Sequence, residues 1–158
     1  MREAVETYFE DFAVGEVIET SRLTVTESHL VAWAGLTGDW HPLHMDAEFA
    51  ATEGPFGARV AHGPFVFALS VGLVEKAGVL GRSVLAWLGT DELRALLPVF
   101  VGDTLRVRVT VLETRLSRSD PSRGIVGLGY ETLNQGGAVV MRCRYNVMIR
   151  ARAGGRPA

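Results

Sequence analysis

The chain has 158 residues, of which 47% are hydrophobic and 22% are charged, a composition typical of one globular domain with its own core. Its formal net charge of −2 offers no broad positive surface for nucleic acid or for an anionic membrane. We therefore expect its partners to be small molecules or further copies of the same chain.

Cysteine content and hydropathy bear on the compartment. Cys143 is the only cysteine, so no intrachain disulfide can form, and its alternating surroundings predict a buried, inert thiol. The first residues lack the apolar segment of a signal peptide, and no stretch approaches the roughly 20 apolar residues of a membrane span. We expect a cytoplasmic protein with one domain over residues 1–152 and a flexible tail over 153–158.

The first part of the chain predicts one strand and two short helices. Residues 17–25 are rich in β-branched types and favour a strand. Thr26 can cap a helix that Gly35 and Gly38 end, and Asp46 can cap a second helix over 46–53. The first of these helices carries Leu30, Val31, Trp33 and Ala34, and in the second Phe49 and Ala50 are expected to face inward.

A third helix is predicted over residues 63–78, which are apolar on nearly every face until Glu75. Pro64 suits a first helical turn and Gly78 suits a C-terminal stop. A helix without a polar face must be buried, so this segment is expected to form the centre of the fold.

From residue 82 onward apolar residues alternate with polar ones, which is the pattern of strands with one buried face. Turn residues at 120–122 and 134–137 separate strands expected near 82–97, 103–117, 123–133 and 138–151. Long strands joined by short turns form an antiparallel sheet. The sequence therefore predicts an α+β domain in which a sheet wraps around the central helix.

The segment from Gly38 to His44 is the first candidate for a reactive site. His41 precedes Pro42, which excludes the α-helical region for His41 and predicts a turn or extended loop over 39–44. Such a bend can bring the Asp39 carboxylate to the His44 imidazole, a pair suited to acid and base chemistry near neutral pH. The alternative is structural: Asp39 makes a hydrogen bond within a turn, and His44 is an ordinary loop histidine.

A second feature lies where the central helix begins. His62 and Gly63 precede Pro64 there, and unpaired backbone N–H groups and the positive end of the helix dipole gather at such a terminus. These groups can polarise a carbonyl oxygen and stabilise an enolate. The alternative is that Gly63 only permits a tight turn into the helix.

The same residues could instead bind zinc, through His41 and His44 with either His62 or Asp46. Neither an HExxH helix nor a paired-cysteine spacing is present, so we expect no metal and no cofactor. His29 is expected at the surface or in a first helical turn. The three tryptophans are expected in the core or in a pocket wall, and they are Trp33, Trp40 and Trp87.

Three segments, taken together and in order, resemble the MaoC-like dehydratase or (R)-specific enoyl-CoA hydratase family. They are Thr37-Gly38-Asp39-Trp40-His41-Pro42-Leu43-His44-Met45-Asp46, Arg59-Val60-Ala61-His62-Gly63 and Pro98-Val99-Phe100-Val101-Gly102-Asp103-Thr104-Leu105. The resemblance covers residues 9–150 and implies a single hot-dog fold. It also implies at least a homodimer whose sheets join edge to edge, with acyl-CoA tunnels at the subunit interface.

The resemblance further implies reversible hydration of a 2-enoyl-CoA to a 3-hydroxyacyl-CoA. By position, Asp39 and His44 match the catalytic pair that activates water, and Gly63 matches the backbone donor to the thioester carbonyl. His62, Trp40 and His41 are further candidates for substrate binding.

Two positions depart from the family's pattern. His41 stands where many hydratases have asparagine, and Ser70 lies one position before the helix serine of many relatives. A thioesterase, with Glu75 as its carboxylate, and a non-catalytic acyl-binding or assembly subunit remain the alternatives.

Overall fold

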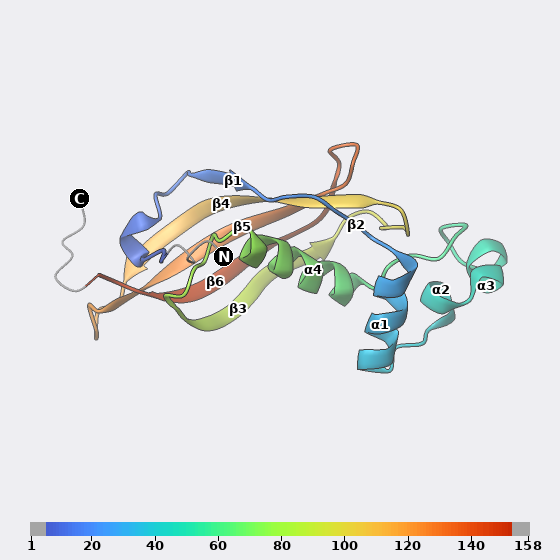
Figure 1. Ribbon diagram of the computed structural model, residues 1–158, viewed down its shortest axis with the longest axis horizontal. Coiled ribbons are helices and arrows are strands. Elements are labelled where there is room, and N and C mark those ends of the chain that lie inside the picture. Colours follow the sequence, from blue (N-terminus) through green and yellow to red (C-terminus); the bar gives the residue numbers. More distant parts are fainter. Residues whose placement is uncertain (1–5, 153–158) are drawn as a thin grey trace.

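The computed structural model describes residues 6–152, so the predicted tail over 153–158 lies outside the described part. A six-stranded antiparallel sheet wraps around one long helix, α4 (Gly63–Lys76), as Figure 1 shows. This arrangement confirms the predicted α+β, hot-dog architecture. Within residues 6–152, no helix is both long and apolar enough to cross a membrane.

Four long strands form most of the sheet, and each lies within two residues of its predicted bounds. They are β3 (Val84–Ala95), β4 (Thr104–Leu116), β5 (Arg123–Leu133) and β6 (Val139–Arg150). The order across the sheet is β1-β4-β5-β6-β3. β3 therefore pairs with β6 at one edge, and β5 and β6 separate it from β4, its neighbour in sequence.

The predicted strand over 17–25 is two short strands, β1 (Val17–Glu19) and β2 (Leu23–Thr24), which both pair with β4. The break has a local cause. The backbone N–H of Val107 donates to the Thr20 hydroxyl at 2.9 Å, so a side chain replaces a backbone carbonyl in the ladder. A single-turn 3-10 helix, η1 (Phe9–Asp11), precedes β1.

The helix after β2 is α1 (Glu27–Thr37), with Thr26 at its N-cap as predicted. Gly38 ends it in the left-handed region, at φ 78°, whereas Gly35 lies inside the helix. The predicted helix over 46–53 is α3 (Ala47–Thr52), capped by the Asp46 carboxylate, which accepts from the N–H groups of Glu48 and Phe49.

One further helix was not predicted. Residues 42–45 form the single turn α2 (Pro42–Met45), where a turn or extended loop was expected. Proline at the first helical position favours this turn, and His41 keeps the extended backbone that a residue before proline requires, at φ −56° and ψ 134°. The expectation was right for His41 and wrong for the residues after it.

The main core lies between α4 and the sheet. The buried residues Leu73 and Val74 of α4 meet alternating valines of β4 and β5, including Val107, Val109 and Val126. The helix is not covered on every side, because Ala68 and Gly72 are exposed in the single chain. Figure 1 shows α1, α2 and α3 gathered beyond the N-terminal end of α4, where the candidate site lies.

Candidate active site

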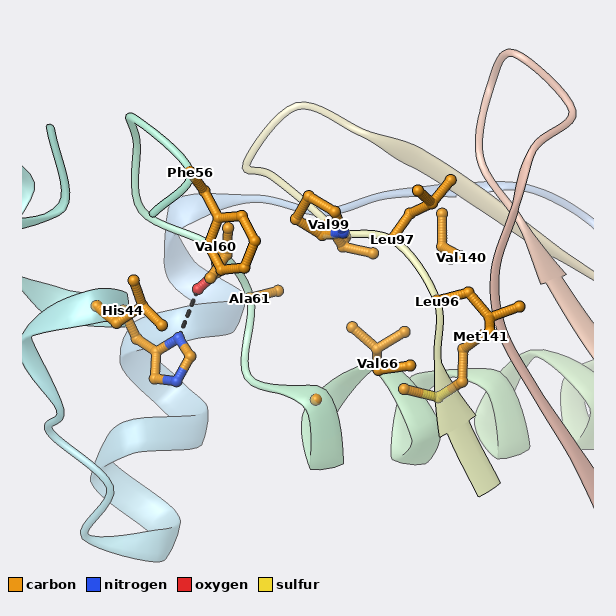
Figure 2. Close-up of a pocket in the computed structure, with 14 residues that line it drawn as sticks. His44, Phe56, Val60, Ala61, Val66, Leu96, Leu97, Val99, Val140 and Met141 are labelled. Atoms are coloured by element: carbon orange, nitrogen blue, oxygen red, sulfur yellow. Dashed lines mark hydrogen bonds between the residues drawn. The ribbon is translucent and has the colours of Figure 1, made fainter. Parts of the chain in front are cut away.

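His44 is carried by α2 and is held by a backbone carbonyl. Its Nδ1 atom lies 2.7 Å from the carbonyl oxygen of Val60, as the dashed line in Figure 2 shows. Because a carbonyl oxygen only accepts, Nδ1 is the donor and carries a proton. In the neutral ring the lone pair is therefore on Nε2, and this nitrogen is free to act as a base.

The short helix α2 orients His44. Nδ1 of His41 accepts from the backbone N–H of Leu43 at 3.2 Å, so the His41 side chain caps the turn. A capping acceptor at this position stabilises a helix that otherwise has unpaired N–H groups. His41 therefore stabilises the helix that carries His44. It does not line the cavity beside His44 that is described below.

Hydrogen bonds and an ion pair hold the loop that supplies the Val60 carbonyl. The N–H of Val60 donates to the carbonyl of Leu43 at 3.3 Å, and the N–H of Ala61 donates to the carbonyl of Val99 at 2.7 Å. Arg59 pairs with Glu27 of α1 through two bonds of 2.7 Å, and this guanidinium lowers the pKa of the Glu27 carboxyl. Sequence reasoning missed Val60, because the group that acts is a main-chain oxygen that any residue provides.

Asp39 follows the left-handed Gly38 and lies on the exposed segment between α1 and α2. Its Oδ1 atom accepts from the N–H of His41 at 3.3 Å, which is the turn hydrogen bond of the structural alternative. The carboxylate is also near two imidazoles, since one ligand-type atom from each of Asp39, His44 and His62 lies within 4.8 Å of the others. The predicted bend therefore brings Asp39 and His44 together while Asp39 also stabilises the turn.

The third member of this cluster is His62, the N-cap residue of α4. Its ring packs against that of His44, with centroids 3.9 Å apart and planes inclined by 30°. Its Nε2 atom lies 3.0 Å from the backbone carbonyl oxygen of Asp39. His62 is completely buried, at 0% exposed.

The surroundings of His44 lower its pKa below the ordinary histidine value. Burial is the largest cause, and the neighbouring imidazoles of His62 and His41 act in the same direction. The Val60 carbonyl and the Asp39 carboxylate oppose them by stabilising the protonated ring. The net result favours the neutral imidazole, which is the form that accepts a proton.

An apolar cavity of about 310 Å³ adjoins His44 and the first residue of α4, Gly63. Figure 2 shows His44 at one end and Leu96 and Met141 at the other. His44 is the only titratable residue in its lining; the apolar ones are Leu43, Phe56, Val60, Ala61, Val66, Ala95, Leu96, Leu97, Pro98, Val99, Val140 and Met141. A Cβ added at Gly63 would meet no heavy atom within 4 Å, so the backbone there is open to a ligand.

Two tryptophans lie elsewhere than expected. Trp40 is 56% exposed and Trp87 is 57% exposed, and neither is in the lining of this cavity. Trp87 lies on β3, which is an edge strand in the single chain. Its ring stacks on that of Tyr145, with centroids 6.1 Å apart. The expectation of core or pocket-wall positions is therefore wrong for both in the single chain, whereas Trp33 packs partly buried beside Phe65.

Ser70 has a structural partner inside the core. Its hydroxyl is 2.7 Å from the Thr132 hydroxyl and 2.7 Å from the carbonyl of Val66, and the residue is 2% exposed. Ser70 therefore links α4 to β5 and faces the sheet. It is not in the lining of the cavity beside His44.

The cluster suits acid and base chemistry better than a metal ion. The ligand-type atoms of Asp39, His44 and His62 lie within 4.8 Å of one another, but the two imidazoles lie against each other with planes inclined by 30°. Nδ1 of His44 and Nε2 of His62 are each bonded to a carbonyl. Asp46, the other zinc ligand suggested by the sequence, instead caps α3 through its carboxylate.

The fold described above agrees with comparisons to known proteins. The MaoC like domain family matches residues 10–132. The protein MaoC of Klebsiella aerogenes is 45% identical over 103 residues, which are 65% of this chain and 30% of that protein. The chain thus spans less than a third of the length of this relative.

Two further similarities extend over nearly the whole chain. An (R)-specific enoyl-CoA hydratase of Rhodospirillum rubrum is 33% identical over 148 residues, covering 92% of this chain and 93% of that protein. The crystal structure of a MaoC-like dehydratase from the same species superposes with a TM-score of 0.82 at 34% identity, covering 93% of this chain and 99% of that one. On its matched residues, its fold and these relatives, the chain belongs to the MaoC-like dehydratase family.

Proposed function

We propose that the protein is a hydro-lyase that adds water across the 2,3 double bond of an enoyl-CoA thioester, or removes it in reverse. The observation that carries the proposal is His44: its Nδ1 is held by the Val60 carbonyl, which leaves Nε2 as a base beside the Asp39 carboxylate. The adjoining cavity is apolar and reaches the N-terminus of α4.

In the hydration direction, Asp39 and His44 hold one water molecule and take a proton from it as its oxygen bonds to Cβ. The electrons of the double bond move toward Cα and the thioester carbonyl, giving an enolate-like state. The N–H of Gly63 and the positive end of α4 stabilise the negative charge on the carbonyl oxygen. The pair then returns a proton to Cα, so the sum is one water added and no group lost.

The relatives' names support this reaction class. The (R)-specific enoyl-CoA hydratase of Rhodospirillum rubrum matches over nearly its whole length, and the matching family is described as a MaoC like domain. By analogy with that relative, we propose that the 3-hydroxyacyl product has the R configuration. A thioesterase is less well supported, because its candidate carboxylate, Glu75, is exposed and is not in the lining of the cavity.

The acyl group that we propose is uncharged. The lining of the cavity holds no arginine or lysine, so nothing in it pairs with a carboxylate on the acyl chain. Transfer of an unpaired carboxylate into such surroundings is costly. We therefore expect simple enoyl thioesters such as crotonyl-CoA to react faster than dicarboxylic ones such as mesaconyl-CoA.

We also propose that the protein is a homodimer, with β3 as the joining edge. This strand carries four large exposed apolar side chains, Leu85, Trp87, Leu88 and Leu93, and no other strand of the described chain lies beyond it. Exposed edges of this kind are normally paired or covered. Light scattering on the purified protein tests this, and a monomer at micromolar concentration would contradict it.

The test of the reaction is direct. The purified protein is mixed with crotonyl-CoA; the absorbance of the enoyl thioester is followed, and free CoA is titrated with a thiol reagent. Loss of absorbance without release of CoA, together with 3-hydroxybutyryl-CoA as product, is the expected result. Release of CoA without hydration would show a thioesterase instead, and the absence of both reactions across a panel of chain lengths would favour a binding subunit.

A further inference from the structure

His62 contacts both members of the proposed catalytic pair without facing the cavity. Its ring lies against the ring of His44, with centroids 3.9 Å apart, and its Nε2 is 3.0 Å from the backbone carbonyl of Asp39. Because a carbonyl oxygen only accepts, Nε2 is the donor in this bond. One imidazole at the start of α4 thus touches the helix that carries His44 and the segment that carries Asp39.

We infer that His62 is a positioning residue, which fixes Asp39 and His44 relative to each other and contacts no substrate itself. Its place in the sequence had suggested a substrate-binding role. Its side chain is 0% exposed, however, and it is not among the residues that line the cavity beside His44 and Gly63. The consequence for catalysis rests on the proposed function, whereas the positional claim can be tested without any substrate.

The hydrogen bond from His62 matters for Asp39 because the segment that carries Asp39 is exposed. Within that segment the hydrogen bonds are short-range: the N–H of Trp40 donates to the carbonyl of Gly38, and the N–H of Asp39 donates to the Thr37 hydroxyl. These bonds shape the turn but do not connect it to the body of the domain. The bond from His62 does connect it, and it does so at the N-terminus of the central helix.

The second nitrogen of His62 suggests that stability alone does not explain this residue. Nδ1 is buried and has no hydrogen-bond partner among residues 6–152. A buried polar atom without a partner is destabilising, and native structures retain few of them. An aromatic hydrocarbon ring would fill the same space without that cost, so the histidine is better explained by its contacts to Asp39 and His44.

The adjacent His62 ring also affects the pKa of His44. Burial is the main cause of the lowered pKa of His44, and His62 contributes to it as a neighbouring imidazole. The other titratable groups that act on His44 are Asp39, which raises its pKa, and His41, which lowers it. Removing the ring of His62 would open one face of His44 to water and move its pKa toward the ordinary value.

Two substitutions separate the two contacts. His62→Phe keeps a ring against His44 but removes the donor to Asp39, whereas His62→Gln keeps a donor near the position of Nε2 but removes the ring. His29→Gln in the full-length protein is the matched control. His29 accepts from the N–H of Thr26 at the start of α1, and glutamine is a usual capping-box residue at that position.

The first readout is the titration of His44, followed by NMR of ¹⁵N-labelled histidine in the absence of substrate. We expect both His62 variants to raise its midpoint, with the larger rise in His62→Gln because the covering ring is lost as well, and the His29 control to leave it unchanged. The second readout is crotonyl-CoA hydration, where both His62 variants should lose kcat on the order of 10- to 100-fold with little change in KM. The melting temperature of His62→Phe should change little, because the lost bond goes to an exposed segment and the buried unpaired Nδ1 is removed with it.

The inference is overturned if the His44 titration is the same in all four proteins. It is also overturned if His62→Phe and His62→Gln keep the wild-type kcat, or if KM rises while kcat does not, which would make His62 a substrate-binding residue. If the wild-type protein hydrates no enoyl thioester, the proposed function fails, and the NMR titration alone decides the positional claim. If His62→Gln does not fold, the kcat and melting temperature of His62→Phe decide it.

Discussion

The Nδ1 atom of His44 donates to the main-chain carbonyl of Val60 at 2.7 Å, and this single bond decides which nitrogen of the ring can act as a base. A main-chain acceptor cannot be removed by changing a side chain. Its position depends instead on the bonds from Val60 to Leu43 and from Ala61 to Val99. The tautomer of the proposed catalytic histidine is therefore set by the fold.

The fall of kcat/KM at acidic pH should follow the protonation of His44. Its pKa is below the ordinary value of 6.5 in the folded protein, chiefly through burial. The neutral ring is the active base, so kcat/KM should be constant at pH values above 6.5. It should fall only as the pH drops through the lowered pKa of His44. Hydration rates measured between acid and neutral pH check this, and an acidic midpoint at or above 6.5 would contradict it.

Gly63→Ala should weaken substrate binding without weakening the fold. The added methyl group would meet no protein atom within 4 Å, and Gly63 lies in the lining of the cavity, so the methyl group takes space that the substrate needs. We expect a raised KM and an unchanged melting temperature. Gly72→Ala is the matched control, since it lies on the same helix, is equally open and is outside the cavity. Equal KM values in the two variants would refute the assignment of Gly63.

Ser70→Ala should affect stability and leave catalysis intact. The change removes a buried hydroxyl that bonds to Thr132 and to the Val66 carbonyl, and leaving such partners unpaired costs about 1–3 kcal/mol. Urea unfolding measures the loss, and Ser119→Ala, in an exposed loop, serves as the control. A large fall in kcat with unchanged stability would show that Ser70 acts on the water after all.

His41 offers a comparison of two substitutions. His41→Asn keeps a side-chain acceptor for the N–H of Leu43, whereas His41→Ala removes it, and loss of a helix cap costs about 1 kcal/mol. We expect near-normal kcat for the asparagine variant and a reduced kcat for the alanine variant, because α2 carries His44. Equal loss in both variants would mean that the imidazole of His41 has a role beyond capping.

The elements of the fold with strong local signals could be predicted from the sequence. The apolar run between Pro64 and Gly78 predicted α4, and strict alternation predicted the four long strands. The helix α2 was missed because a four-residue turn has no periodic pattern, and its formation depends on Pro42 and on the His41 cap. The break between β1 and β2 was missed because it depends on Thr20 meeting Val107, 87 residues away.

The site was predictable only in part. The spacing of Asp39 and His44 and the glycine at the start of α4 suggested the groups that we propose to react, and the structure brings these residues to one end of the fold. About half of the cavity wall comes from residues 95–99 and 140–141, which lie far from Asp39 and His44 in sequence, so the spacing of that pair could not show that these segments meet it. The exposure of Trp40 and Trp87 depends on which segments pack against them in the single chain. That packing is also a property of the tertiary structure.

The most direct measurement compares crotonyl-CoA hydration by the wild-type protein, Asp39→Asn, His44→Ala and the control Asp46→Asn. Asp46 carries the same side chain as Asp39 and is near it in sequence, but it caps α3, and asparagine can take over that role. We expect the first two variants to lose hydration while keeping the wild-type circular dichroism spectrum, and Asp46→Asn to stay active. Wild-type rates in folded Asp39→Asn or His44→Ala would contradict the central claim that this pair activates the water.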